Sequence, residues 1–137
     1  GLAVLPYMQQ NIAERKMLSE TYDEALKDLP ITRPKLPEEL EYNYAYYPVL
    51  FENEETLLKV VENLKKNEII PRRYFWPSLE KLPYIKSKST CNISNDISSR
   101  IICLPLYNFL SNDLIENISL LIRTALVNIE ITIDSRR

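Results

Sequence analysis

Helical and strand-like segments alternate along this chain at uneven intervals, and this order restricts the folds that it can adopt. Apolar residues recur with helical spacing in residues 2–29, 54–64 and 111–125. Short runs of branched and aromatic side chains, typical of strands, occupy residues 43–51, 68–70 and 101–104. The connections are too uneven for repeated β-α-β units. We therefore expect an α+β domain, with a small three-stranded, mainly antiparallel sheet packed with helices and entered by one long N-terminal helix.

Local signals set the expected ends of these elements. Pro30 is expected to end the first helix near Asp28. Asn53 and Ser111 are expected to cap the second and third helices, because their side chains can accept a hydrogen bond from an unpaired backbone N–H. Pro48 predicts an edge strand or a bulge in the first strand-like run.

Two segments lack a clear period. Residues 78–99 are rich in Ser, Lys and Asn, and this composition predicts mainly a surface connection. Isoleucine alternates with other residues at 129–133, a pattern that suits either a strand or an irregular tail. We therefore assign residues 1–125 to one domain and residues 126–137 to a tail of unassigned structure.

The absence of histidine excludes several kinds of catalytic and metal site. A chain without histidine cannot build a Ser-His-Asp or Cys-His arrangement, or a zinc site with a histidine ligand. Its single glycine is at position 1, so no glycine-rich phosphate loop can follow. The 17 basic and 19 acidic residues give a net charge of −2, which argues against a general polyanion binder. Nucleic acid is therefore not an expected partner.

The two cysteines and the hydropathy pattern indicate a cytoplasmic protein. Cys91 and Cys103 match no metal-ligand spacing, and we expect free thiols that are buried or partly buried. No apolar run approaches the length of a membrane span, and no charged region followed by an apolar one opens the chain. We expect a soluble chain with neither a metal nor a membrane partner.

Paired acids, lysines and tyrosines do not indicate a catalytic centre. Glu54 and Glu55 lie where a helix begins, a position at which acidic residues stabilise the helix. Lys65 and Lys66 lie at an expected exposed helix end, where neither amine is desolvated enough to act as a nucleophile. We assign no catalytic residue to this chain. Four tyrosines are expected to serve packing: Tyr42, Tyr44, Tyr46 and Tyr47.

The segment at residues 70–79, which reads Ile-Pro-Arg-Arg-Tyr-Phe-Trp-Pro-Ser-Leu, contains the candidate binding residues. An arginine presents a planar fork to phosphate or carboxylate, and aromatic faces stack on bases and sugars. An equally weighted alternative places the rings in a core or a subunit interface and the arginines in surface ion pairs. The candidate binding residues are Arg72, Arg73, Tyr74, Phe75 and Trp76.

Several short motifs follow one another along residues 1–125. They are Gly-Leu-Ala-Val-Leu at the start, Arg15 and Lys16 followed by Tyr22, Tyr44-Ala-Tyr-Tyr-Pro-Val-Leu-Phe51, Pro71-Arg-Arg-Tyr-Phe-Trp-Pro-Ser-Leu79, Lys81-Leu-Pro-Tyr84, Cys91 to Ser94, and Arg100-Ile-Ile-Cys-Leu-Pro-Leu-Tyr107. Their order and spacing are specific, and together they resemble the C-terminal part of the DegT/DnrJ/EryC1/StrS family of sugar aminotransferases.

The resemblance implies a fold-type I, pyridoxal-phosphate enzyme that transfers an amino group, typically from glutamate, to a keto-sugar nucleotide. In this family a lysine holds the cofactor as a Schiff base, and both this lysine and the acidic partner of the pyridine nitrogen belong to a large N-terminal domain. We expect that domain to precede Gly1 in a longer parent protein, since the first helical pattern begins in mid-period. The chain alone is then expected to be inactive and to bind no pyridoxal phosphate.

The resemblance also implies the role of residues 70–79. Arg72, Arg73 and Tyr74 would lie near the nucleotide-sugar, with Phe75 and Trp76 shaping the pocket. Trp76 stands where relatives often have tyrosine, which puts a role for a hydroxyl there in doubt. The Pro-Arg-Arg-Tyr-Phe pattern favours a dTDP-linked 4-keto-6-deoxy sugar, used in cell-surface polysaccharide biosynthesis. The family forms homodimers, so we expect a homodimeric parent and self-association of this chain.

Two other functions remain open on the residues alone. The chain could be a free-standing protein-interaction module that docks a partner through the rings of Tyr74, Phe75 and Trp76. It could also bind single-stranded nucleic acid by stacking, which predicts a strong dependence on salt.

Overall fold

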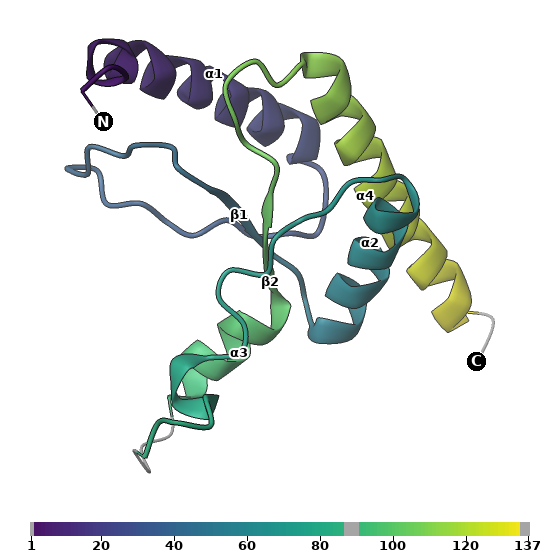
Figure 1. Ribbon diagram of the computed structural model, residues 1–137. Helices are drawn as coiled ribbons and strands as arrows, with labels where there is room; N and C mark the ends of the chain where they lie inside the picture. Colours follow the sequence, from purple (N-terminus) through teal and green to yellow (C-terminus); the bar gives the residue numbers. More distant parts are fainter. Residues whose placement is uncertain (1, 87–90, 135–137) are drawn as a thin grey trace.

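The computed structural model describes residues 2–86 and 91–134 and confirms the α+β class (Figure 1). Within these residues, no helix is both long enough and apolar enough to cross a membrane. In chain order the elements are a 3-10 turn η1 (Leu5–Tyr7), α1 (Met8–Leu26), β1 (Tyr47–Leu50), α2 (Glu54–Lys66), a 3-10 turn η2 (Leu79–Lys81), α3 (Asn92–Arg100), β2 (Ile101–Leu104) and α4 (Asn112–Asp134).

The sheet of the described chain has two antiparallel strands, so the expectation of three strands is not confirmed. Residues 68–70 form no strand, because the N–H of Ile69 donates to the Leu64 carbonyl at the end of α2 (3.0 Å) and Pro71 has no N–H to donate. Single bridges extend the sheet on both sides, Thr32 with Leu50 and Arg72 with Cys103.

The core lies between the sheet and the helices α1, α2 and α4. Helix α4 packs against both α1 and α2 (Figure 1). The expected buried face of α4 is present, since Ile115, Ile118 and Ile122 are fully buried. Burial of this apolar surface is the main favourable contribution to the stability of the domain.

The first helix is buried only along its second half. Leu18, Tyr22 and Leu26 face the core, whereas Leu2 is 88% exposed and Met8 is 46% exposed. The helix ends at Leu26, before Pro30, as expected. The apolar periodicity of residues 2–12 therefore predicted a helical face that the described chain leaves in contact with solvent.

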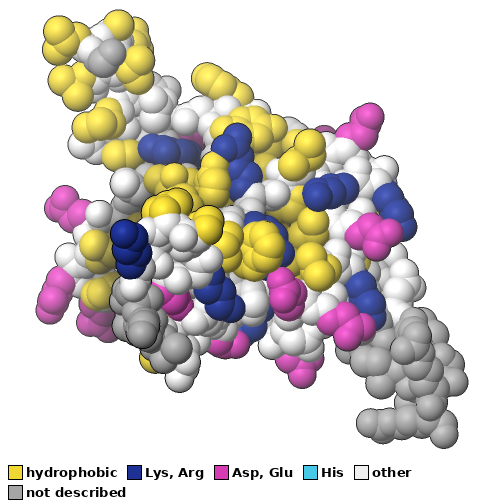
Figure 2. Space-filling view, turned by 60° about the horizontal axis from the view of Figure 1, so that its bottom comes forward, with side chains coloured by type: hydrophobic (Ala, Val, Ile, Leu, Met, Phe, Trp, Pro, Cys, Tyr) yellow, Lys and Arg dark blue, Asp and Glu magenta, His cyan; other side chains and the backbone are white. Residues whose placement is uncertain are grey.

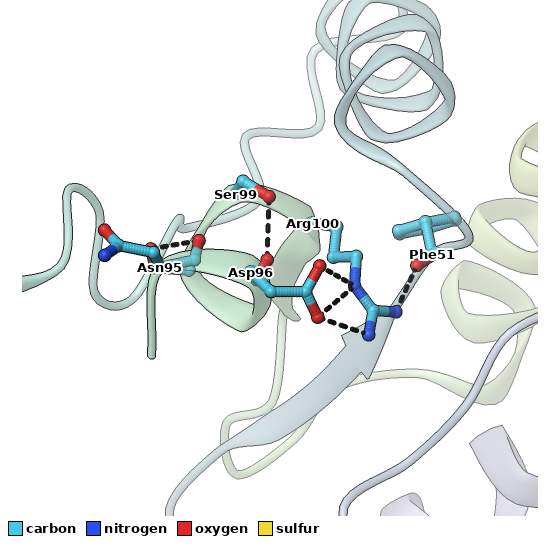
Figure 3. Close-up of polar contacts among 6 residues, drawn as sticks. Phe51, Asn95, Asp96, Ser99 and Arg100 are labelled. Atoms are coloured by element: carbon cyan, nitrogen blue, oxygen red, sulfur yellow. Dashed lines mark hydrogen bonds and ion pairs between the residues drawn. The ribbon is translucent and has the colours of Figure 1, made fainter. Parts of the chain in front are cut away.

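The sequence did not predict helix α3, since residues 78–99 were expected to form mainly a surface connection. Only Ser98 of this helix is buried, so its sequence shows no apolar stripe. Arg100 instead holds its end in place, with an ion pair to Asp96 (2.8 Å) and a hydrogen bond to the Phe51 carbonyl (2.9 Å; Figure 3). The pKa of Asp96 is lowered by the hydrogen bonds from Arg100. Tertiary contacts therefore stabilise a helix that local sequence does not predict.

The final isoleucines belong to neither a strand nor an irregular tail. Helix α4 continues through residues 129–133 to Asp134. The alternating pattern covers too few residues to outweigh the helix that precedes it. Adding one residue to a formed helix costs far less free energy than nucleating a new element.

Both expected helix caps are present. The Asn53 side-chain oxygen accepts from the Thr56 N–H (2.9 Å), and the Ser111 hydroxyl accepts from the Leu114 N–H (3.2 Å). Asn53→Ala is expected to lower the free energy of unfolding by about 1 kcal/mol, since an N–H at the start of α2 loses its partner. Asn53→Asp restores an acceptor and should retain nearly full stability. Urea denaturation measures both variants, and equal midpoints for Asn53→Ala and the unchanged chain would contradict this role.

Candidate functional site

An open pocket of about 450 Å³ lies beside β2. Its walls come from three segments: residues 45–46 before β1, residues 70–74, and residues 103–107 at and beyond the end of β2. The side chains that give it chemical character are Tyr46, Arg72, Tyr74, Cys103 and Tyr107. The pocket therefore combines one guanidinium with three tyrosines.

A backbone bridge fixes the wall that contains Arg72. The Arg72 N–H donates to the Cys103 carbonyl (3.1 Å), and the Cys103 N–H donates to the Arg72 carbonyl (2.7 Å). This pair adds Arg72 to the free edge of β2. The chain then turns, since the Tyr74 N–H donates to the Arg72 carbonyl (3.1 Å); Arg72 and Tyr74 both line the pocket, whereas Arg73 does not.

Arg72 and Tyr74 form the polar part of the pocket. An Arg72 N–H donates to the Tyr74 hydroxyl, and the guanidinium carbon lies 5.6 Å from the centre of that ring. The Tyr74 ring in turn packs edge-on against the ring of Tyr46, with centres 5.5 Å apart. A guanidinium flanked by rings and hydroxyls can bind an anion while a planar or hydroxylated group lies on the rings.

The structure separates the five residues singled out in residues 70–79. Arg72 and Tyr74 line the pocket, and Phe75 stacks on Tyr74 at 5.0 Å while remaining 71% exposed. Arg73 and Trp76 are not among the lining residues; the Arg73 guanidinium lies over the Trp76 ring at 4.5 Å. Figure 2 shows hydrophobic and basic side chains intermixed across the middle of one face.

The pocket contains no obvious catalytic group within the described chain. No Asp, Glu or Lys lines it among the described residues. The Cys103 thiol does line it, but burial raises the pKa of that thiol, so it stays protonated and is a poor nucleophile near neutral pH. The other cysteine, Cys91, is exposed rather than buried. The pocket can thus bind and orient a ligand, and its described wall offers no carboxylate or amine for acid–base chemistry.

Sequence reasoning did not single out two of the pocket residues. Tyr46 was expected to serve packing like Tyr47, yet Tyr46 is 48% exposed at the pocket while Tyr47 is 1% exposed. Tyr107 entered only as the last residue of a motif. The signal that could have revealed both is their position, since each lies just outside a strand of the pair β1 and β2.

Comparison with known proteins assigns the chain to a family. The model of the DegT/DnrJ/EryC1/StrS aminotransferase family matches residues 1–123. The chain belongs to this family. The prediction drawn from the ordered motifs is thereby confirmed, and the matched region includes the whole pocket wall.

Individual relatives agree with this assignment. A dTDP-4-amino-4,6-dideoxy-D-glucose transaminase of Escherichia coli is 31% identical over 130 residues, which cover 89% of this chain. DesI, whose crystal structure was determined in the presence of its TDP-sugar product, is 26% identical to this chain in sequence. The two structures match with a TM-score of 0.83 over 100% of this chain. A family member from Brucella abortus is 25% identical, with a TM-score of 0.77 over 90% of this chain.

The match covers only part of each relative. This chain spans 35% of the length of the Escherichia coli transaminase, 37% of DesI and 33% of the Brucella abortus protein. Each relative is therefore about three times as long as this chain. The transfer of an amino group is a property of those longer proteins.

Proposed function

We propose that this chain forms the C-terminal part of a pyridoxal-phosphate-dependent aminotransferase acting on a nucleotide-linked keto-sugar. Its own contribution is part of the sugar-nucleotide site. The observation that carries the proposal is the pocket in which Arg72 lies among Tyr46, Tyr74 and Tyr107, in a chain that belongs to an aminotransferase family. Arginine pairs with phosphate through a planar fork, and tyrosine supplies both a face for rings and a hydroxyl for sugar oxygens.

The substrate in this proposal is a dTDP-linked 4-keto-6-deoxy sugar, with glutamate as the amino donor. The Escherichia coli relative is named for a dTDP-linked amino sugar, and the crystal structure of DesI was determined in the presence of its TDP-sugar product. A diphosphate carries the charge that the Arg72 guanidinium can neutralise. The pocket volume of about 450 Å³ suits part of such a ligand, within the usual range of small-molecule sites.

Pyridoxal phosphate does not fit the pocket of this chain, because no described lysine lines it and the group requires a lysine amine. We therefore propose that a region outside this pocket holds the cofactor in the parent protein, and that this chain alone is inactive. The parent is proposed to be a homodimer, in which exposed apolar residues at the start of the chain, such as Leu2 and Leu5, would be covered.

Incubation of the chain with pyridoxal phosphate followed by borohydride is expected to give no stoichiometric adduct on one lysine. The reason is that lysines such as Lys16, Lys59 and Lys66 are paired with glutamates on helix surfaces, so none of these amines is desolvated for the reaction. Mass spectrometry of tryptic peptides measures the adducts. The denatured chain is the control and should show the same low, scattered labelling; one fully labelled lysine in the folded chain alone would contradict this expectation.

Titration of the chain with dTDP-4-amino-4,6-dideoxy-D-glucose, followed by ligand-observed NMR, tests the proposed function. We expect weak binding, with a dissociation constant on the order of 1 mM, because the chain would supply only one wall of the site. Glucose and inorganic phosphate at the same concentration are controls for contacts that require only a sugar or only an anion. Equal binding of all three ligands, or no binding, would count against the proposal.

One observation favours the alternative of a protein-interaction module. Phe75 is 71% exposed and Leu79 is 70% exposed, so two apolar side chains of residues 70–79 face solvent. An interaction module of this kind has no need of Arg72 and predicts no binding of the nucleotide-sugar. The titration therefore separates the two functions.

A further inference from the structure

The adjacent residues Arg72 and Arg73 have opposite environments. Arg72 is exposed at the pocket, and its guanidinium donates to the Tyr74 hydroxyl. The Arg73 side chain retains only 20% of its accessible surface. Its guanidinium contacts a side-chain carboxylate, a backbone carbonyl and an aromatic ring.

The contacts of Arg73 join three separate elements. Its Nη2 donates to a Glu54 carboxylate oxygen at the first residue of α2 (2.9 Å) and to the Ser99 carbonyl in the last turn of α3 (2.8 Å). The last carbonyls of a helix lack intrahelical partners and favour a cation. The Trp76 ring then covers the guanidinium at 4.5 Å. Arg73 therefore connects residues 72–76 to the start of α2 and the end of α3.

This connection uses none of the residues that line the pocket. The backbone bridge to Cys103 fixes Arg72, and the contacts of the Arg73 guanidinium fix the next residue. Two anchors on adjacent residues restrict rotation of the segment about the strand edge. The Arg72 fork and the Tyr74 hydroxyl are then held toward the pocket before a ligand arrives, which reduces the entropy lost on binding.

We propose that Arg73 is a positioning residue, which fixes residues 72–76 between α2 and α3 so that Arg72 and Tyr74 face the pocket. It touches no ligand itself. This inference rests on the proposed function, since it assumes that Arg72 binds the nucleotide-sugar. It assigns different roles to two neighbouring arginines that the sequence presents as equivalent.

The fluorescence of Trp76 tests the first half of this inference without any ligand, since it is the single tryptophan of the chain. Arg73→Ala and Glu54→Gln are expected to shift its emission to longer wavelength and to raise its quenching by acrylamide. Arg72→Ala, on the pocket side, should change neither. Circular dichroism at a temperature where each variant is folded controls for global unfolding. Unchanged emission and quenching in both Arg73→Ala and Glu54→Gln would overturn the inference.

A double-mutant cycle with dTDP as the probe tests the second half. We expect Arg73→Ala to weaken binding about tenfold and the double variant Arg72→Ala with Arg73→Ala to bind no more weakly than Arg72→Ala alone, because Arg73 acts through Arg72. Arg73→Lys, which keeps the charge opposite Glu54, should restore part of the affinity. Additive losses would show that Arg73 contacts the ligand, and unchanged affinity with only a lower Tm would show a purely structural role; either result overturns the inference.

The two experiments also separate this inference from the proposed function. If the unchanged chain binds no dTDP, the proposed function fails. The fluorescence comparison then still decides whether Arg73 holds the segment in place.

Discussion

Replacing Tyr22 by alanine is expected to lower the free energy of unfolding by about 4 kcal/mol, as typical for truncation of a large buried ring. Tyr22 is 0% exposed and stacks on Tyr47 with ring centres 4.6 Å apart. Its hydroxyl donates to the carbonyl of Pro105 (3.0 Å), which lies in the pocket wall. Burial raises the pKa of this hydroxyl, so it remains a donor well into the alkaline range. The substitution removes the ring that connects α1 with β1 and the chain after β2.

Urea denaturation followed by circular dichroism measures this loss. Tyr22→Phe keeps the ring and removes only the hydroxyl, so it should cost about 1–2 kcal/mol and remain folded even if the alanine variant does not. Met17→Ala, at a position of α1 that is 60% exposed, is the surface control and should change stability by less than about 0.5 kcal/mol. A cost for Tyr22→Ala no greater than that of Met17→Ala would contradict the description of the core.

Arg72→Ala is expected to weaken binding of dTDP-4-amino-4,6-dideoxy-D-glucose by about tenfold to a hundredfold, because a charge-assisted, forked contact to phosphate is lost. Arg72 is exposed and contributes little to packing, so the free energy of unfolding should hardly change. Arg72→Lys keeps the positive charge without the planar fork and should give an intermediate loss.

Lys66→Ala is the matched control for net charge. Lys66 lies at the exposed end of α2 and pairs with Glu62, so its removal takes away one positive charge outside the pocket wall. Calorimetric titration compares the three variants with the unchanged chain. Equal losses for Arg72→Ala and Lys66→Ala would reduce the role of Arg72 to long-range charge and contradict a direct contact.

The elements that the sequence predicted are those with a local cause. Residues 101–104 form β2 as expected, because their continuous apolar run suits a buried strand. The starts of α2 and α4 follow from the caps Asn53 and Ser111. A cap or a helical apolar stripe acts within a few residues, so a single sequence contains the whole signal.

Two departures from the sequence-based expectation have different causes. Helix α3 is held by Arg100 through the Phe51 carbonyl, a partner 49 residues away, so a tertiary contact overrides local preference. The segment 68–70 has strand-like side chains, but the Leu64 carbonyl at the end of α2 accepts the N–H of Ile69, and Pro71 has no N–H to donate. Here the end of the preceding helix and a nearby proline outweigh the β propensity of a short run.

The candidate site was predictable only in part. The sequence singled out residues 72–76 as one cluster of cations and rings. In the structure, where Arg72 pairs with Cys103, only Arg72 and Tyr74 of this cluster line the pocket. Tyr107 joins them only because β2 leads it to the same place. This long-range pairing has no signature in the local pattern of side chains.

The most direct test of the claim that this pocket is part of a nucleotide-sugar site is protein-observed NMR of the chain with labelled tyrosine rings. On addition of dTDP-4-amino-4,6-dideoxy-D-glucose, the signals of Tyr46, Tyr74 and Tyr107 should shift together with one binding curve, because these rings line the pocket. The signals of Tyr22 and Tyr47 should stay in place, because both rings are buried. No shift at any of the three pocket tyrosines up to tenfold above a dissociation constant on the order of 1 mM would contradict the account.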